Sequence, residues 1–366
     1  MPLTWDQVFT WRLRRQFVEP QAKSVTEIVR RLCGVQAQVT SAAEMAVALR
    51  SAAPESGALV RELHDGTLIK TWAMRGTLHA LTPELATAYL SLLASTRVWE
   101  KPVWQRNFGA SPEDVAALGV EVRRVLDGKA LTRDELVDAI IADPAFDRLG
   151  EQLRSGWGAL LKPLAWQGFL CHGPAQGTKV TFADPAQLIT GWPGLPEPDA
   201  AAPLAIRSYL SAYGPSTPEA FDAWLSRGSV RKPVLRRWFS ELGDDLTEVE
   251  VEGRRGYLCT EHVDELAATK PAKSVHLLGG FDQYVLGPGT ADTALLPGDH
   301  RAKVSRTAGW ISPIVVAGGR IVGTWELDED AVVVSMFDDA PLPKKGLGTA
   351  VDQLGAALGR EALTVR

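Results

Sequence analysis

The stretch SVTEIVRRLCGVQAQVTSAAEMAVALRS, residues 24–51, carries the signals of two helices joined by a short connection. Ser24 and Glu27 have the spacing of a capping box, which satisfies free backbone N–H groups at the start of a helix. Apolar residues then recur at intervals of three and four, as on one face of an amphipathic helix. Ser41 and Glu44 repeat the capping-box spacing. We therefore predict one helix after each box.

The connection contains two glutamines, Gln36 and Gln38, in apolar surroundings. In a regular helix, side chains two residues apart point to nearly opposite sides, so these amides would not converge. At a helix end the backbone can leave helical geometry, and both amides can then face one cavity. Neutral amides neither gain nor lose a proton near pH 7, and they serve equally well to satisfy a helix end. The two residues alone therefore leave a catalytic and a structural role open.

The order helix, helix, helix, hairpin occurs around this stretch and recurs twice. The first hairpin is predicted at residues 68–82, around a turn that contains glycine. A capping box at residues 132–135 opens a second copy, whose hairpin is predicted at residues 171–183. Residues 217–218, a Thr followed by a Pro, open a third copy, with a hairpin at 246–259. This order is that of a winged helix.

From Val275 onward the pattern changes to short strands and turns, with a hairpin signal at Gly318 and Gly319 and a helix at the end. We predict an α+β protein with three tandem winged-helix units and a small C-terminal β-rich domain that forms a partial barrel. A segment rich in Pro and Gly separates the second unit from the third. The predicted domains are residues 1–105, which carry the glutamines, 106–190, 203–268, and 272–366 with the terminal helix.

The composition bounds the possible functions. The 366 residues are 45% hydrophobic and 23% charged, which is typical of a globular protein. The net charge of −5 gives no general affinity for nucleic acid, so any such binding must come from local basic clusters. For any single cluster, a solvated helix face is the favoured interpretation.

Several classes of site and of location are not indicated. The first residues lack the apolar stretch of a signal peptide, and no apolar run reaches membrane-spanning length. Cys33, Cys171 and Cys259 are far apart, which fits a reducing compartment. We expect a cytoplasmic, nucleoid-associated protein without a membrane partner. Without a CxxC pair or a histidine cluster we expect no metal and no cofactor, and P-loop, GxSxG and HExxH motifs are absent.

Four stretches, RLCGVQAQ, WAMRGTLHALTPEL, GGFDQYVLG and GWISPIVVAGGRIVGTWEL, resemble in this order the AlkZ/YcaQ superfamily of winged-helix DNA glycosylases. The resemblance covers nearly the whole chain and implies that the winged-helix units curve around a basic, concave channel. The family's catalytic signature is glutamine, an apolar residue, then glutamine or aspartate. Gln36, Ala37 and Gln38 match it, which implies that both glutamines are catalytic.

The resemblance also implies the reaction. A monofunctional glycosylase of this kind hydrolyses the N-glycosidic bond of cationic N7-alkylguanine and unhooks interstrand crosslinks, in self-resistance to a DNA-alkylating natural product such as azinomycin. Its partner is double-stranded DNA with N7-alkylpurine lesions or crosslinks, and we expect a monomer. The chemistry suits amides, because an alkylated guanine leaves without needing a strong acid. One amide oxygen can orient the attacking water, and a second can stabilise the positive charge that develops on the sugar.

Further candidate residues follow from charge and position. The candidates for DNA contact are Arg12, Arg14, Arg15, Arg75, His79, Lys179, Arg254, Arg255, Arg301, Lys303 and Arg306. Asp282 and Tyr284 are candidates for a pocket at a strand end. A turn-forming Asp and a core Tyr are the equally good structural interpretation of this second pair.

Two other functions remain open at the level of sequence. A winged-helix transcriptional regulator would bind DNA without catalysis, but it would need a symmetric dimer and base-reading residues on a recognition helix. The mainly apolar helix predicted in GALLKPLAWQGFL speaks against it. A bifunctional glycosylase/lyase would need an amine nucleophile, for which Lys70 is the candidate.

Overall fold

The computed structural model describes residues 3–156, 158–360 and 362–366, and the chain divides into two compact units. Unit 1 contains the described residues up to Val60, then Ile206–Trp224 and Phe239–Arg366, and unit 2 contains Arg61–Ala205 and Leu225–Trp238. Both units combine helices with mainly antiparallel sheet, which confirms the predicted α+β class. The four predicted domains, which were defined by sequence repeats, stay a prediction.

The N-terminal helices of unit 1 begin largely as the sequence predicts. The first three are α1 (Trp5–Arg15), α2 (Val25–Arg31) and α3 (Thr40–Ala48), with the short strand β1 (Val35–Gln36) between the last two. The hydroxyl of Ser24 accepts a hydrogen bond from the Glu27 N–H (3.1 Å), which confirms the Ser24 half of the first predicted box. The predicted box at Ser41 is wrong, because α3 begins at Thr40 without a side-chain cap.

Glu44 caps a different helix. Its carboxylate accepts hydrogen bonds from the backbone N–H groups of Leu59 (3.4 Å) and Val60 (3.0 Å), in the first turn of α4 (Ala58–His64). These N–H groups have no partner within their own helix, so a carboxylate close to them is stabilised by hydrogen bonds and by the helix dipole. The capping-box spacing therefore marks a capping residue but not the helix that it caps.

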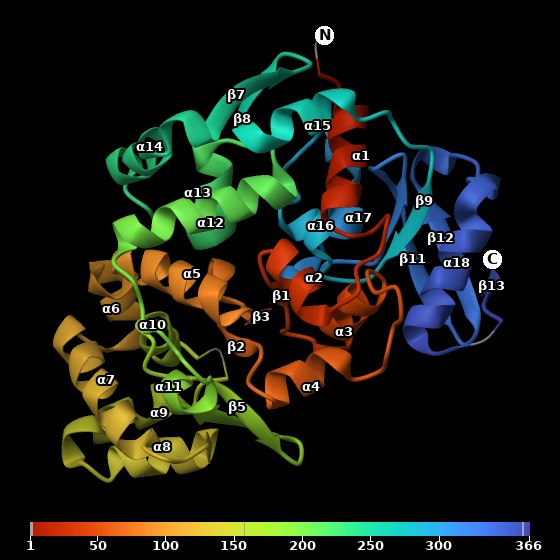
Figure 1. Ribbon diagram of the computed structural model, residues 1–366. Coiled ribbons are helices and arrows are strands. Elements are labelled where there is room, and N and C mark those ends of the chain that lie inside the picture. The colour runs from red at the N-terminus through yellow and green to blue at the C-terminus, as the bar shows by residue number, and fades with distance from the viewer. Residues whose placement is uncertain (1–2, 157, 361) are drawn as a thin grey trace. The chain divides into compact units, whose positions relative to one another are not determined.

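The C-terminal part of unit 1 is a curled five-stranded sheet in the order β13-β12-β11-β10-β9. Its strands are β9 (Val275–Leu278), β10 (Ile314–Ala317), β11 (Arg320–Asp328), β12 (Ala331–Met336) and β13 (Thr364–Val365). Gly318 and Gly319 link β10 to β11 with φ of 55° and 82°, so the predicted hairpin is confirmed with the left-handed backbone that such turns require. The terminal helix α18 (Lys344–Leu358) packs beside β9, and both are blue to teal in Figure 1.

The segment after β9 differs from the prediction of short strands alone. Asp282 begins the short helix α16 (Gln283–Leu286), because its carboxylate accepts a hydrogen bond from the Tyr284 N–H (2.8 Å). A second short helix, α17 (Arg301–Val304), precedes β10. Both helices pack apolar side chains into the same core as the sheet.

The predicted third hairpin is also confirmed. It consists of β7 (Leu246–Val251) and β8 (Arg254–Cys259), followed by α15 (Val263–Ala268). The helices before it are α12 (Pro198–Tyr213), α13 (Pro218–Ser226) and α14 (Lys232–Glu241). The hydroxyl of Thr217 accepts a hydrogen bond from the Ala220 N–H (3.2 Å) and caps α13 as the sequence indicates.

In unit 2, the two remaining predicted hairpins join in one sheet in the order β3-β2-β5-β6-β4. Its strands are β2 (Ile69–Trp72), β3 (Leu78–Leu81), β4 (Leu131–Thr132), β5 (Cys171–Gln176) and β6 (Lys179–Ala183). The helices are α5 (Pro83–Ser95), α6 (Pro102–Phe108), α7 (Pro112–Leu126), α8 (Arg133–Ile141), α9 (Gly150–Arg154), α10 (Leu161–Trp166) and α11 (Pro185–Leu188). Thr132 and Glu135 form the predicted capping box of α8. Within the described part of the chain, no helix has the length and apolarity to span a membrane.

Candidate active site

The two glutamines lie where the backbone leaves one helix and enters the next, as predicted. After α2, Cys33 and Gly34 adopt left-handed conformations with φ of 56° and 99°, which turn the chain out of the helix and into β1. The backbone is still extended at Val39, immediately before α3. The junction therefore frees Gln36 and Gln38 from the opposed directions that a helix would impose.

The environments of the two amides differ. Gln36 is 7% exposed, and its Oε1 atom accepts no hydrogen bond from the residues that the structure describes. Gln38 is exposed at the surface. A buried carbonyl oxygen without a donor is unfavourable by roughly 1–3 kcal/mol. The Gln36 oxygen is therefore suited to accept a hydrogen bond from water or substrate.

The helix end before the glutamines is fixed by Tyr213, whose hydroxyl donates a hydrogen bond to the carbonyl oxygen of Leu32. Burial raises the pKa of Tyr213 well above its usual range, so the phenol stays protonated and remains a donor. The ring packs against the backbone of Gly287, where an added Cβ would lie 2.2 Å from the ring. The junction is thus held by the interior of unit 1.

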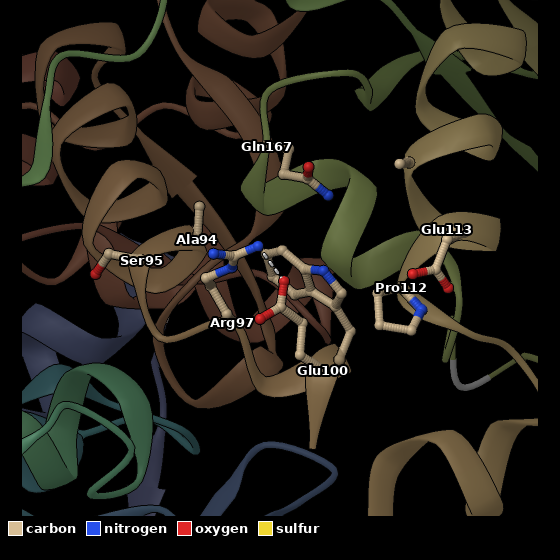
Figure 2. Close-up of a pocket in the computed structure, with 9 residues that line it drawn as sticks. Ala94, Ser95, Arg97, Glu100, Pro112, Glu113 and Gln167 are labelled. Carbon is tan, nitrogen blue, oxygen red and sulfur yellow. Dashed lines mark ion pairs between the residues drawn. The ribbon is translucent and has the colours of Figure 1, made fainter. Parts of the chain in front are cut away.

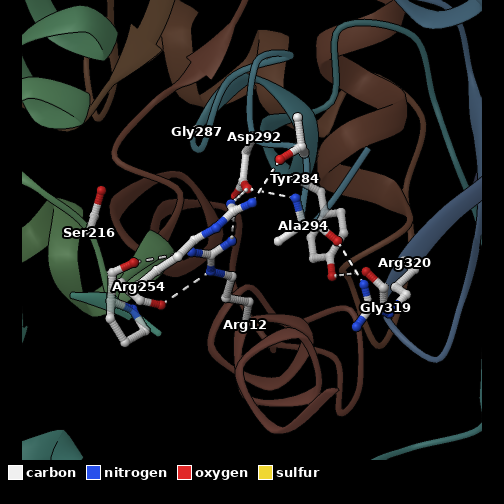
Figure 3. A network of polar contacts seen from close by, with 12 residues as sticks. Arg12, Ser216, Arg254, Tyr284, Gly287, Asp292, Ala294, Gly319 and Arg320 are labelled. Atoms are coloured by element: carbon white, nitrogen blue, oxygen red, sulfur yellow. Dashed lines mark hydrogen bonds and ion pairs between the residues drawn. The ribbon is translucent and has the colours of Figure 1, made fainter. Parts of the chain in front are cut away.

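Arg12, a predicted DNA contact, lies inside unit 1 in the polar network of Figure 3. Its guanidinium donates from Nε to the carbonyl oxygen of Gly214 (3.1 Å) and from Nη2 to that of Pro215 (3.3 Å). Arg12 and Arg254 each lie 3.6 Å from the carboxylate of Asp292. The Arg254 side chain is 53% exposed. Arg12 is therefore a buried residue of this network, whereas Arg254 lies at the surface.

The two other arginines of α1 also differ from each other in burial. Arg15 donates to the carbonyl oxygen of Ser211 (3.0 Å), and its Nη2 lies 3.0 Å from Nε2 of His262. Burial, with a contribution from the charge of Arg31, lowers the pKa of Arg15. Arg14 is exposed. Of the three arginines of α1, Arg14 is therefore the one that is best placed to meet DNA.

The remaining basic candidates of unit 1 are at the surface. Arg255 is exposed and lies 3.6 Å from Glu248 and 3.8 Å from Glu250 on the neighbouring strand, so its charge is partly compensated. The segment that contains α17 carries three exposed cations, Arg301, Lys303 and Arg306. This segment is the densest basic surface among the predicted residues of the unit.

In unit 2, the predicted DNA contacts occupy different environments. Arg75 is half-buried at the turn between β2 and β3, with φ of 57°. Lys179 is exposed at the start of β6. His79 is fully buried, and its Nδ1 donates to the carbonyl oxygen of Thr77 (3.0 Å). Burial, and then the charge of Arg75, lowers the pKa of His79 from 6.5 to about 3. His79 is a neutral core residue.

The buried histidines make the stability of unit 2 sensitive to acid. Burial lowers the pKa of His172 to about 3 as well. In the unfolded chain both rings titrate near 6.5, so protonation favours unfolding below that pH. We expect full stability above pH 6.5 and a loss of about 2 kcal/mol per ring at pH 5. His79→Gln should show a smaller fall in melting temperature between pH 7 and pH 5 than the wild type. Equal falls would contradict this account.

Asp282 and Tyr284 have structural partners. Both oxygens of the Asp282 carboxylate accept hydrogen bonds from the guanidinium of Arg50 (2.8 and 2.7 Å), and both side chains are fully buried. The Tyr284 hydroxyl donates to the carbonyl oxygen of Gly319 (2.6 Å). This geometry favours the turn-forming Asp and core Tyr of the structural interpretation. Arg50 was missed because 232 residues separate it from its partner.

A cavity of about 420 Å³ in unit 2, shown in Figure 2, is lined by the ion pair of Arg97 and Glu100 together with Glu113 and Gln167. It carries no histidine or cysteine, and we assign it no catalytic role. No group of three or more His, Cys, Asp and Glu side chains in the described ranges is placed to hold a metal ion.

These features are those of a known class of DNA repair enzyme. Residues 29–362 match the family described as DNA glycosylase AlkZ-like, so the chain belongs to this family of DNA glycosylases. The chain is 54% identical over 369 residues to an interstrand DNA cross-link repair glycosylase of Streptomyces sahachiroi, and 100% of both proteins is covered. The solved structure of the Streptomyces sahachiroi DNA glycosylase AlkZ matches with a TM-score of 0.97, 54% identity and 100% coverage of both chains. The resemblance, the fold class and the enzyme class predicted from sequence are thereby confirmed.

Proposed function

We propose that this DNA glycosylase hydrolyses the N-glycosidic bond of cationic N7-alkylguanine in double-stranded DNA and unhooks interstrand crosslinks formed through such guanines. The observation that carries the proposal is the buried, unpaired Oε1 atom of Gln36 at the helix junction. The Streptomyces sahachiroi relative, at 54% identity, is an interstrand DNA cross-link repair glycosylase. We further propose that the enzyme acts as a monomer and protects its host from a DNA-alkylating natural product such as azinomycin.

The charge of the lesion explains why amides suffice. Alkylation at N7 leaves a positive charge on guanine, and the base departs as a neutral molecule. The bond can therefore break without a proton from the enzyme. What remains is a sugar with oxocarbenium character and an incoming water. Fixed dipoles that face a developing charge lower the barrier because they need no reorganisation.

The different environments of the amides suggest separate roles. The Oε1 atom of Gln36 is buried and can hold the attacking water by one hydrogen bond. Gln38 is exposed and can reach the DNA, where its carbonyl oxygen would face the positive charge on the sugar. Neither role requires ionisation of the enzyme.

The proposal is tested with a duplex that contains a single N7-methylguanine, with a uracil duplex in parallel. We expect free N7-methylguanine and an abasic site from the first duplex, measured by mass spectrometry and by alkaline cleavage, and very little uracil from the second. Binding of both duplexes without base release would support the transcriptional regulator instead. Efficient uracil release would contradict the charge argument.

A bifunctional glycosylase/lyase remains the alternative chemistry, because burial lowers the pKa of Lys70 on β2, as is usual for an amine nucleophile. We propose that the enzyme is monofunctional. Borohydride in the reaction should then trap no covalent protein–DNA adduct. An adduct that forms with the wild type and is lost in Lys70→Gln would overturn this proposal.

The affinity for DNA should fall steeply with salt, despite the acidic pI of 5.8. Each phosphate contact adds about −0.9 to the slope of log K against log salt. We expect the combined variant Lys303→Gln and Arg306→Gln to lower the steepness by about one per lost contact. Arg124→Gln, at an exposed arginine paired with Glu121, is the control and should keep the slope. A flat salt dependence would show that the basic clusters are only solvated surface.

A further inference from the structure

A groove of about 510 Å³ in unit 1 begins at the residue that follows Gln38. One wall is the start of α3, with Val39 and Ser41, and the other is formed by β11 and the loop before β10. The loop contributes Arg306 and Trp310. The groove therefore begins one residue after Gln38 along the chain.

Trp310 is 48% exposed and is the one exposed tryptophan in the part of the chain that the structure describes. Its ring packs against Phe281 in a T-shaped arrangement, with centroids 5.0 Å apart and an interplanar angle of 76°. The Arg306 N–H donates to the carbonyl oxygen of Trp310 (2.8 Å), and the Trp310 N–H donates to that of Thr307 (3.2 Å). The loop thus keeps the indole at the surface, although burial of this apolar ring would stabilise the fold.

The lining of the groove matches a nucleobase. A base has flat faces that stack on aromatic rings in a way that tolerates any sequence, and polar edges that need hydrogen-bond partners. Trp310 offers the stacking face, while Ser41, Thr324 and Glu326 offer polar groups. Arg306 is exposed beside the ring and supplies the positive charge that a backbone phosphate requires. Aromatic ring, polar groups and cation occur together within one groove.

We propose that the groove receives an unstacked DNA base from the immediate neighbourhood of the lesion, which stacks on Trp310 while Arg306 binds the adjoining phosphate. The inference rests on the proposed function. A guanine tied to the opposite strand cannot leave the helix on its own, whereas its neighbour can. Withdrawal of that neighbour opens the stack beside the scissile sugar and admits the water that Gln36 orients. In this mechanism a nucleotide adjacent to the lesion flips out of the helix, and the lesion itself stays in place.

The binding test uses duplexes with 2′-fluoro-N7-methylguanosine, because fluorine at C2′ destabilises the oxocarbenium-like transition state and leaves the lesion uncut. A thymine is placed in turn at the 5′ and the 3′ neighbour of the lesion and beside the cytosine that pairs with it, because permanganate oxidises a thymine that has left the DNA stack faster than a stacked one. We expect the wild type to raise the permanganate reactivity at one of these positions, which identifies the source of the base. Trp310→Ala should abolish the rise, and Trp310→Phe should retain most of it.

The kinetic test uses cleavable N7-methylguanine duplexes. Trp310→Ala should lower kcat/KM for base release by about 10- to 100-fold, as expected for the loss of one base–aromatic stack, with Trp310→Phe close to the wild type. Val60→Ala, at a position 47% exposed in the same unit, is the matched control and should change neither readout. Thermal unfolding confirms that each variant is folded.

The outcomes separate the two proposals. An equal rise in permanganate reactivity with wild type and Trp310→Ala, or no rise at any position, would overturn the stacking site even if the wild type releases N7-methylguanine. Absence of base release by the wild type would instead refute the proposed function, since the permanganate assay with the uncut duplex does not depend on catalysis.

Discussion

Gln36→Ala and Gln38→Ala should each lower the rate of N7-methylguanine release by on the order of 10- to 10³-fold, the usual effect of removing one preorganised polar group. The expectation rests on their position between α2 and α3 and on the unpaired oxygen of Gln36. Neither variant should unfold, because the buried oxygen of Gln36 has no partner to lose and Gln38 is exposed. Single-turnover base release and thermal unfolding measure the two effects separately.

Two controls sharpen the test. Gln38→Asp keeps a carbonyl-type oxygen at the third position of the family signature and should retain more activity than Gln38→Ala. Gln167→Ala removes a half-buried amide in unit 2 whose Nε2 donates to the carbonyl oxygen of Pro163 (3.0 Å), and base release should be unchanged. Wild-type rates for both alanine variants at positions 36 and 38 would remove the glutamines from the mechanism.

Asp282→Ala should destabilise the protein by about 3–5 kcal/mol, because it leaves the guanidinium of Arg50 buried without its counter-charge. Both side chains are fully buried, and the carboxylate also caps α16 through the Tyr284 N–H. Chemical denaturation monitored by tryptophan fluorescence measures the loss. The double variant Arg50→Met with Asp282→Leu should recover part of it, since apolar replacement of a buried pair is often tolerated.

The double-mutant comparison also distinguishes a structural Asp282 from a catalytic one. If the carboxylate only holds Arg50, the double variant recovers base release per folded molecule together with stability. A loss below about 1 kcal/mol in Asp282→Ala, which is the range of a surface pair, would contradict the structural role.

The features that the sequence predicts correctly depend on residues that are close together in the chain. The caps at Ser24 and Thr132 and the hairpin at Gly318 and Gly319 were predictable because each depends on residues within a few positions. The glutamine junction was predictable for the same reason. One helix ends before the glutamines and another begins after them, so the backbone has to change direction between these points, however the rest of the chain folds.

What the sequence could not predict depends on distant partners. Glu44 caps a helix through the N–H of Leu59, 15 residues later, and Arg12 donates to the carbonyl oxygen of Gly214, 202 residues away. Nothing in the sequence separates this buried arginine from the exposed Arg14 two positions on. Trp310 was one of twelve tryptophans, and only the fold shows that it stays at the surface.

The most direct measurement of the central claim uses a duplex crosslinked through the N7 atoms of two guanines on opposite strands, with one strand labelled. After incubation with the wild type, a denaturing gel should show the crosslinked species converted to single strands that carry abasic sites, while a uracil duplex in parallel stays intact. Gln36→Ala and Gln38→Ala should leave the crosslink in place. A crosslink that survives the wild type while uracil is removed would contradict both the lesion class and the amide mechanism.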